Sequence, residues 1–202
     1  MKALLELFFF TLLLTIGASL DCETCMVFNT DNIECQKKTC DAGQDTCVVG
    51  VSKTSVDGQS ILSSVKTCQS SDICNLLAPV HMHFGKDRVM QANGDCCTGD
   101  VCITASPQLP PVNTTTNGKQ CPACFSLASC NPEMVDCTGS EDYCFEVVTQ
   151  LMAGQSMSTT LKGCTTESFC TAIQSGKVNL ANIGVSLAKA ECQPASRAVP
   201  SA

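Results

Sequence analysis

The sequence predicts an all-β, small disulfide-rich fold built as two tandem modules. Three observations support this: eighteen cysteines among 202 residues, a cysteine spacing that occurs twice, and β-branched runs around turn signals. Aromatic residues make up only 4% of the chain and tryptophan is absent, so core burial alone cannot hold two small domains together. Disulfides provide the missing stability and persist in oxidising compartments, which disfavours a cytosolic enzyme.

Residues 1–19 have the organisation of a secretory signal peptide. Lys2 supplies a positive start, Leu7–Ile16 is an apolar run, and small residues follow up to Ser19. The apolar run is too short to span a bilayer, so a retained N-terminal anchor is the weaker interpretation. Residues 193–202 lack the hydrophobic tail that a glycolipid anchor requires. We therefore expect a secreted, extracellular protein without a membrane anchor.

The cysteines fall into two copies of one pattern. Steps of three, seven, six and 22 residues between successive cysteines in the first half recur unchanged in the second half. Agreement over such long intervals indicates an internal repeat. The predicted organisation is a ten-cysteine module over residues 20–103, a linker rich in proline and threonine over 104–120, an eight-cysteine module over 121–193, and a tail over 194–202.

Each copy contains the signal of a β-hairpin. Between Cys47 and Cys68, β-branched residues stand on both sides of an Asp-Gly pair at 57–58, which predicts two strands and a two-residue turn. The counterpart, Phe145–Leu161, is expected to turn near Ala153-Gly154. These segments make strands the dominant element of both modules.

The segment before the last cysteine allows two interpretations. Ile183, Val185 and Leu187 alternate as in a strand, but their spacing and that of Leu180 also fit a helix over residues 178–190. No long helix is predicted elsewhere.

The charge balance restricts the class of partner. A formal net charge of −7 has the wrong sign for a protein that binds a phosphate backbone, so nucleic acid is excluded. An anionic membrane surface is disfavoured for the same reason. The negative charge would instead favour encounter with a basic protein.

The residues do not form a recognisable catalytic motif. Both histidines, His81 and His83, lie in the first copy, and no Gly-x-Ser-x-Gly occurs. The pair Cys96-Cys97 is followed by Thr-Gly-Asp, without the histidine found there in secreted phospholipase A2. A metal at His81 and His83 would need further ligands, and no carboxylate lies within three residues. We expect no enzymatic activity, no cofactor and no metal.

The opening Cys-x-x-Cys, the hairpin between cysteines and the closing Cys-Cys pair resemble the lymphocyte-antigen-6/urokinase-receptor family. The resemblance implies a three-finger (snake-toxin-like) fold in each module. Spacing alone leaves the connectivity open, since eight cysteines already allow 105 pairings. The resemblance implies nine pairs: Cys22–Cys47, Cys25–Cys35, Cys40–Cys68, Cys74–Cys96, Cys97–Cys102, Cys121–Cys144, Cys124–Cys130, Cys137–Cys164 and Cys170–Cys192. None crosses the linker, so limited proteolysis is expected to separate the modules, unless a glycan or an interface between them shields the site.

The whole plan is similar to that of gamma-class phospholipase A2 inhibitors and related three-finger proteins. The matching stretches are LDCETC at 20–25, DTCVV at 45–49 and NGKQCPAC at 117–124. One departure is Ile103, which follows Cys102 where the fold usually places asparagine. The resemblance implies a non-catalytic protein that inhibits secreted phospholipase A2 by direct complex formation. The alternative is an extracellular signalling ligand or pheromone-type protein acting on a receptor. A homo- or hetero-oligomer is left open.

The linker contains two candidate sites. Leu109, Pro110, Pro111 and Val112 form an apolar segment that could contact the lipid-facing surface of a phospholipase, although a plain spacer explains it as well. Asn113-Thr114-Thr115 is the only N-glycosylation sequon in the chain. On an exposed secreted linker, Asn113 is the expected acceptor.

Overall fold

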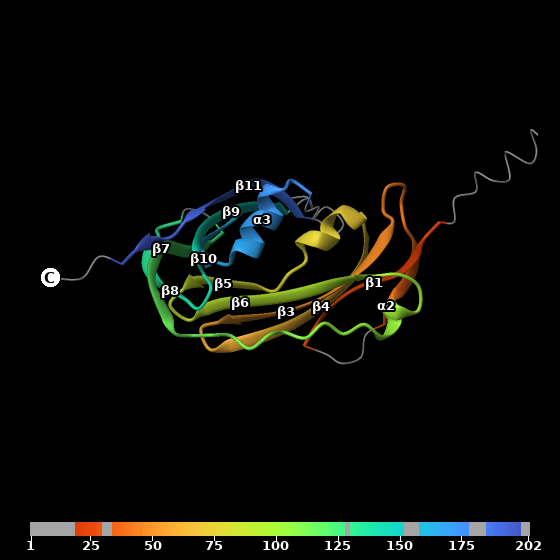
Figure 1. Cartoon of the computed structure of the whole chain (residues 1–202), viewed down its shortest axis with the longest axis horizontal. Coiled ribbons are helices and arrows are strands. Elements are labelled where there is room, and N and C mark those ends of the chain that lie inside the picture. The colour runs from red at the N-terminus through yellow and green to blue at the C-terminus, as the bar shows by residue number, and fades with distance from the viewer. Residues whose placement is uncertain (1–18, 30–33, 128–129, 152–157, 178–184, 199–202) are drawn as a thin grey trace, which may run out of the picture.

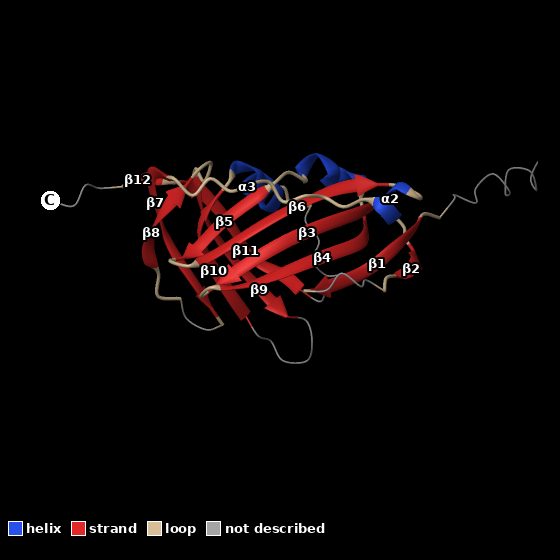
Figure 2. Ribbon diagram, turned by 90° about the horizontal axis from the view of Figure 1, so that it is seen from below, coloured by secondary structure: helices blue, strands red, loops and turns tan. Residues whose placement is uncertain are grey.

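The computed structural model describes residues 19–29, 34–127, 130–151, 158–177 and 185–198. The expected signal segment lies outside these ranges, except for Ser19. Antiparallel strands dominate the described chain, as the sequence predicts (Figures 1 and 2). Within these ranges, no helix is long and apolar enough to cross a membrane.

The first module consists of six strands, a 3₁₀ helix and a short α-helix. In chain order these are β1 (Asp21–Phe28), β2 (Gln36–Thr39), β3 (Thr46–Val56), β4 (Gln59–Gln69), η1 (Ser71–Leu76), β5 (Val80–Gly85), β6 (Arg88–Cys97) and α2 (Val101–Thr104).

The second module consists of six further strands and one helix. They are β7 (Thr116–Ser126), β8 (Glu133–Thr138), β9 (Tyr143–Leu151), β10 (Ser158–Thr165), α3 (Glu167–Gln174), β11 (Val185–Pro194) and β12 (Ser196–Arg197). Strand β7 begins inside the segment expected to be linker, because residues 116–120 gain partners in β8 and β12. Helix α3 is absent from the sequence-based expectation.

The hairpin predicted around residues 57–58 is confirmed. Strands β3 and β4 pair antiparallel up to Val56 and Gln59, which leaves a two-residue turn. Both turn residues have positive φ, 50° at Asp57 and 84° at Gly58, and this geometry favours Asp-Gly. Strands β9 and β10 form the second hairpin. Its expected turn near 153–154 lies outside the described residues.

The segment before the last cysteine is a strand where the structure describes it. Strand β11 pairs with β9 from Val185 to Pro194. The helix interpretation is therefore wrong for residues 185–190, because the β9 edge offers them backbone partners. Residues 178–184 lie outside the described ranges.

One sheet joins the two modules. Its strand order is β11-β9-β10-β5-β6-β3-β4-β1-β2, with β7 paired to β10. The connection is made by β5 and β10, where Cys164 is opposite His83 and Thr165 is opposite Met82. Figure 1 shows the linker as a green trace running from α2 along the first module to β7.

The described residues form three small cores. Two consist mainly of cystines, one in each module. The third combines Met82 and Phe84 of the first module with Phe145, Val147 and Ile173 of the second. This shared core is an interface of the kind that could keep the modules together after cleavage, because separation would expose these buried apolar side chains to water.

All eighteen cysteines are described and all form disulfides. The nine bonds have the connectivity that the three-finger resemblance implies, and none crosses the linker. Covalent linkage therefore stays within each module, while the contact between the modules is noncovalent.

Candidate functional site

The junction between the modules brings strands β5 and β10 unusually close. A Cβ atom at Gly163 would overlap with the backbone carbonyl of His83, so only glycine permits this approach. The carbonyl oxygen of His81 accepts hydrogen bonds from Thr165 Oγ1 at 3.0 Å and from the Thr166 amide at 3.3 Å. Ser168 Oγ donates to the Pro79 carbonyl at 2.8 Å. These bonds tie the end of β10 and the first turn of α3 to the first module.

A buried carboxylate contacts a histidine across this junction. Glu141 is fully buried in the turn after β8, and its Oε2 accepts hydrogen bonds from the amide and hydroxyl of Thr138 at 2.7 and 3.0 Å. Its Oε1 lies 2.7 Å from Nδ1 of His81. The carboxylate is sixty residues away in sequence, so no local pattern indicated it. The structure thus places a carboxylate beside His81 that its sequence neighbours do not provide, but among the described residues His81 and His83 belong to no group of three potential metal ligands.

The structure also contains two close groups of sulfur atoms, one in each module. They are formed by Cys22, Cys40 and Cys68 and by Cys121, Cys137 and Cys164. Every one of these cysteines is in a disulfide, so no thiolate is available to bind a metal. The clusters are explained as the cystine cores of the modules.

The linker residues expected to contact a partner lie beside the module junction. Asn93 Nδ2 donates to the Gln108 carbonyl at 2.9 Å, which fixes the preceding part of the linker against β6. Pro110 and Pro111 are exposed, whereas Leu109 and Val112 are partly buried. Both interpretations of this segment, spacer and contact, are compatible with these positions.

A small hollow lies between the linker and the junction. Its volume is about 230 Å³, and its lining includes His81, Pro110, Pro111, Val112, Gly139 and Thr166. Asn113 is exposed at its edge, and its Oδ1 accepts a hydrogen bond from the Thr115 amide at 3.0 Å. Three of the four expected partner residues, Pro110, Pro111 and Val112, therefore line the same hollow as the sequon residue Asn113, and Leu109 does not.

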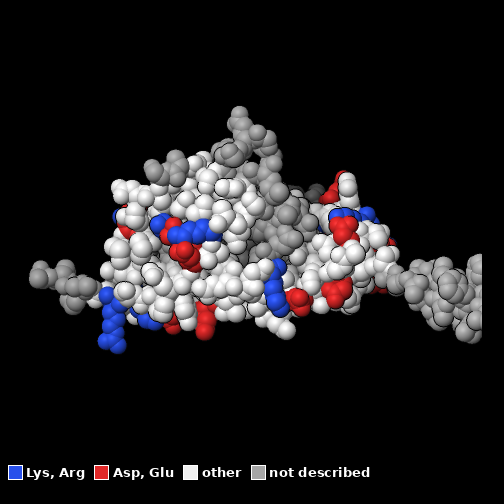
Figure 3. All heavy atoms as spheres, turned by 90° about the horizontal axis from the view of Figure 1, so that it is seen from above, with Lys and Arg blue, Asp and Glu red and all other residues white. Residues whose placement is uncertain are grey.

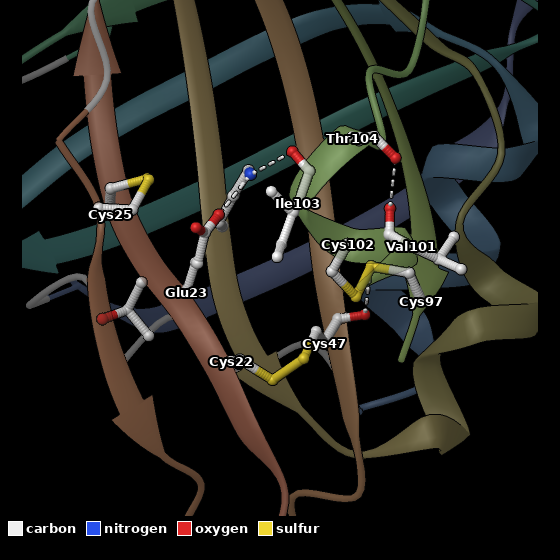
Figure 4. A network of polar contacts seen from close by, with 12 residues as sticks. Cys22, Glu23, Cys25, Cys47, Cys97, Val101, Cys102, Ile103 and Thr104 are labelled. Carbon is white, nitrogen blue, oxygen red and sulfur yellow. Dashed lines mark hydrogen bonds and ion pairs between the residues drawn. A yellow bond between two sulfur atoms is a disulfide. The ribbon is translucent and has the colours of Figure 1, made fainter. Parts of the chain in front are cut away.

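The base of the first module is cross-linked where the linker begins. The Cys22–Cys47 and Cys97–Cys102 bonds lie beside each other, and Glu23 and Ile103 point toward one amino group (Figure 4). That group is Lys66 Nζ, which lies 2.6 Å from Glu23 Oε2 and 3.2 Å from the Ile103 carbonyl. These contacts hold α2 against β1 and β4. Ile103, the departure from the family pattern, contributes its backbone here.

Acidic groups surround an open hollow of about 1030 Å³ at the same base. Hydrogen bonds from Thr39 and Lys37 hold the pKa of Asp21 below its ordinary value, against the opposing effect of desolvation. The Ser71 amide and hydroxyl lower the pKa of Asp45 in the same way.

In the view from above, basic and acidic side chains lie in small mixed groups rather than in one field (Figure 3). On that face, charge is spread over the surface rather than gathered into one site.

Two family models match the chain, one on each module. The family described as "Phospholipase A2 inhibitor" matches residues 20–104, and the "u-PAR/Ly-6 domain" matches residues 117–195. A solved structure, that of mouse TEX101, aligns with 86% of this chain and 98% of its own at 17% identity and a TM-score of 0.36.

The sequence relatives agree with the family models. "Phospholipase A2 inhibitor NAI" of Notechis ater is 35% identical over 181 residues, which cover 85% of this chain and 86% of the relative. A phospholipase A2 inhibitor gamma chain of Elaphe climacophora is 34% identical over 173 residues, with 84% and 86% covered. The chain therefore belongs to the phospholipase A2 inhibitor family, and its second module is a u-PAR/Ly-6 domain.

Proposed function

We propose that this protein is a secreted, extracellular, non-catalytic inhibitor that binds secreted phospholipase A2 directly. The observation that carries the proposal is the identity of 34–35% to relatives named phospholipase A2 inhibitors over more than four fifths of the chain. The match includes both modules, so the arrangement as well as the separate domains is shared.

The architecture supports binding by a preformed surface. Nine disulfides and a shared core order the strands before any partner arrives. Association with a surface that is already ordered loses less conformational entropy, which favours a tight complex.

The test is inhibition of secreted phospholipase A2 by the purified protein. Activity should fall saturably toward a fixed molar ratio of protein to enzyme, and the protein alone should hydrolyse no lipid with or without calcium. Inhibition should persist when lipid is added in excess at constant interface composition, because the enzyme and not the lipid is bound. Absence of binding across acidic and basic isoforms would overturn the proposal in favour of the receptor-ligand alternative.

The linker contact remains a proposal within this function. Leu109→Asp together with Val112→Asp places charges beside the junction hollow, where burial without a partner is costly. If residues 109–112 touch the enzyme, this double variant should inhibit less while being secreted normally. Unchanged inhibition would assign the segment to the spacer role.

Asn113 is proposed as an N-glycosylation site. Its side chain is exposed, and the sequon lies between α2 and β7 rather than inside a paired strand. Glycosidase treatment of the secreted protein should lower its mass by one glycan. Asn113→Gln should remove that difference, and an unchanged wild-type mass would contradict the assignment.

A further inference from the structure

One face of the first module's sheet is free of charge over most of its four central strands. In antiparallel pairing, directly opposite residues share a face, and alternate residues along a strand return to it. The registers of β1, β3, β4 and β6 therefore define one continuous set, here called the apolar sheet face. None of its members is charged: Met26, Phe28, Gly50, Ile61, Val65, Met90, Ala92 and Gly94 have no polar side-chain group, and Ser52, Thr54 and Ser63 have hydroxyl groups, of which those of Ser52 and Ser63 bond each other.

The apolar sheet face ends beside a neutralised cation. Arg88, at the start of β6, is opposite Val56 and lies just beyond the set. Its Nε is 3.4 Å from Asp57 Oδ1, in the turn between β3 and β4. The charge at this boundary is therefore paired within the protein itself.

The outer part of the apolar sheet face is exposed to solvent. Met26, Phe28 and Ile61 have 48%, 56% and 47% of their surface accessible. Met26 stands opposite Val65 and Phe28 opposite Ser63, so β1 and β4 together present these side chains. Large apolar groups exposed side by side in this way are typical of interaction sites.

The opposite face of the same strands has a different character. It carries Lys53, Lys66 and Asp95, and its Asn93 holds the linker through the Gln108 carbonyl. One face is thus charged and partly covered by the protein's own chain. The other lacks charge over the whole set defined above.

The apolar sheet face continues into an interface that the molecule already uses. Met90 stands opposite Met82, and both pack in the core that the two modules share. The sheet that packs at this end against Phe145 and Val147 therefore presents the same face openly at Phe28 and Ile61. The surface is an extension of the contact between the modules.

We propose that the apolar sheet face docks onto the lipid-facing rim of a secreted phospholipase A2. This inference rests on the proposed function and names a surface for it that is separate from the linker contact at residues 109–112. An enzyme that acts on aggregated lipid must present apolar groups around its active site, and burying them against a neutral apolar face leaves no charge unpaired. Occupation of that rim would keep the enzyme from its substrate.

Strand β4 offers a matched pair of variants. Ile61 and Leu62 are neighbours with 47% and 44% exposure, and they point to opposite faces. Ile61→Asp and Leu62→Asp thus make similar changes at similarly exposed sites, and only the first alters the apolar sheet face. Phe28→Asp tests the same face from β1. Secreted yield, thermal unfolding and the absence of free thiols establish that each variant folds.

The measurement is affinity for a purified secreted phospholipase A2 together with inhibition of its activity. Ile61→Asp and Phe28→Asp should each weaken binding by about tenfold or more, and Leu62→Asp should stay within about twofold. Wild-type binding with all three variants unchanged would overturn the docking surface and leave the proposed function standing. Equal losses for Ile61→Asp and Leu62→Asp would also overturn it.

Two further results would count against the proposal. If the wild type binds no phospholipase at all, both this inference and the proposed function fail. If the wild type binds zwitterionic phosphatidylcholine vesicles without enzyme, and Phe28→Asp abolishes that binding, the face is a lipid-binding surface instead. No vesicle binding, combined with the selective losses expected above, would support enzyme docking.

Discussion

The two modules share a disulfide frame but treat the same sheet face differently. Aligned on their cysteines, Gly50 and Val65 of the first module correspond to Val147 and Leu161 of the second. Val147 is buried and Leu161 packs against the shared core, whereas Gly50 and Val65 are only partly buried. The outer residues of this face are exposed in both modules, at 48% and 56% for Met26 and Phe28 and at 41% and 57% for their counterparts Phe125 and Leu127. The frame fixes the path of the chain, and the residues between the cysteines decide which face becomes core and which stays open.

The segment after the hairpin accounts for part of the difference. In the first module it is the six-residue η1, which buries no side chain, and in the second it is the eight-residue α3, which buries Cys170 and Ile173. The longer helix lies against β11, β9 and β5 and completes the third core. A helix only slightly longer is enough to cover the sheet.

The largest effect is expected where the modules meet. Gly163→Ala places a methyl group against the backbone carbonyl of His83, which cannot move aside as a flexible side chain could. We expect destabilisation of about 4 kcal/mol or more and poor secretion. The corresponding residue of the first module is Thr67, and Thr67→Ala should cost less than about 1 kcal/mol. Urea unfolding of the two secreted variants would show whether the close approach exists.

The next largest difference between the modules is expected when a side chain of the segment after the hairpin is truncated. Ile173→Ala removes a buried side chain from the shared core and should cost about 3 kcal/mol. Leu77 is its counterpart after η1 and is only partly buried, so Leu77→Ala should cost about 1 kcal/mol. Denaturant titrations measure both. Equal costs would mean that the two cores are equally packed.

Proteolysis tests whether the modules are held together without covalent bonds. After cleavage in the linker, the fragments should migrate together in native buffer because of the shared core. They should separate in denaturant without reductant, since no disulfide crosses the cut. Separation in native buffer would argue against the junction, and fragments joined in denaturant would contradict the disulfide connectivity.

A smaller, pH-dependent effect is expected on the outer face of the second module. Burial opposes ionisation of Glu146, but hydrogen bonds from Lys189 and Lys162 outweigh it and hold the pKa of this carboxyl below 4.5. The ionised form thus stabilises the fold above that pH, and the contribution is lost as pH falls through the depressed pKa. Glu146→Gln should cost at most about 1 kcal/mol at neutral pH and flatten the acid limb of a stability–pH curve. The corresponding residue Val49 is buried and cannot titrate.

The sequence predicted those parts of the fold that depend on local or repeated signals. The cysteine repeat defines two modules, and the Asp-Gly pair at 57–58 specifies the hairpin turn between β3 and β4 through its positive φ values. Helix α3 was missed because it has only eight residues, one of them the disulfide-bonded Cys170, and so short a segment carries little periodicity. It could have been suspected from the glutamate and serine that follow Thr166.

The junction could not be predicted from one chain. Which strand edges meet depends on the tertiary arrangement, so neither the pairing of β5 with β10 nor the contact of His81 with Glu141 has a local signal. Gly163 does have one signal in the sequence. The repeat aligns it with Thr67, and both copies have a lysine before this position and a cysteine after it. A glycine that replaces a side chain inside a repeated strand indicates close backbone approach.

The edge of the sheet at β2 affects how a partner can approach. This strand is four residues long and fully exposed, and it carries Lys37 and Lys38, which pair with Asp21 and Asp41. Adding a foreign strand there would strip water from charged side chains, a device that discourages edge-to-edge association and aggregation. Recognition by strand addition is thus disfavoured at this edge, while the broad side of the sheet stays accessible. The protein can therefore display exposed apolar side chains without this edge promoting fibre growth.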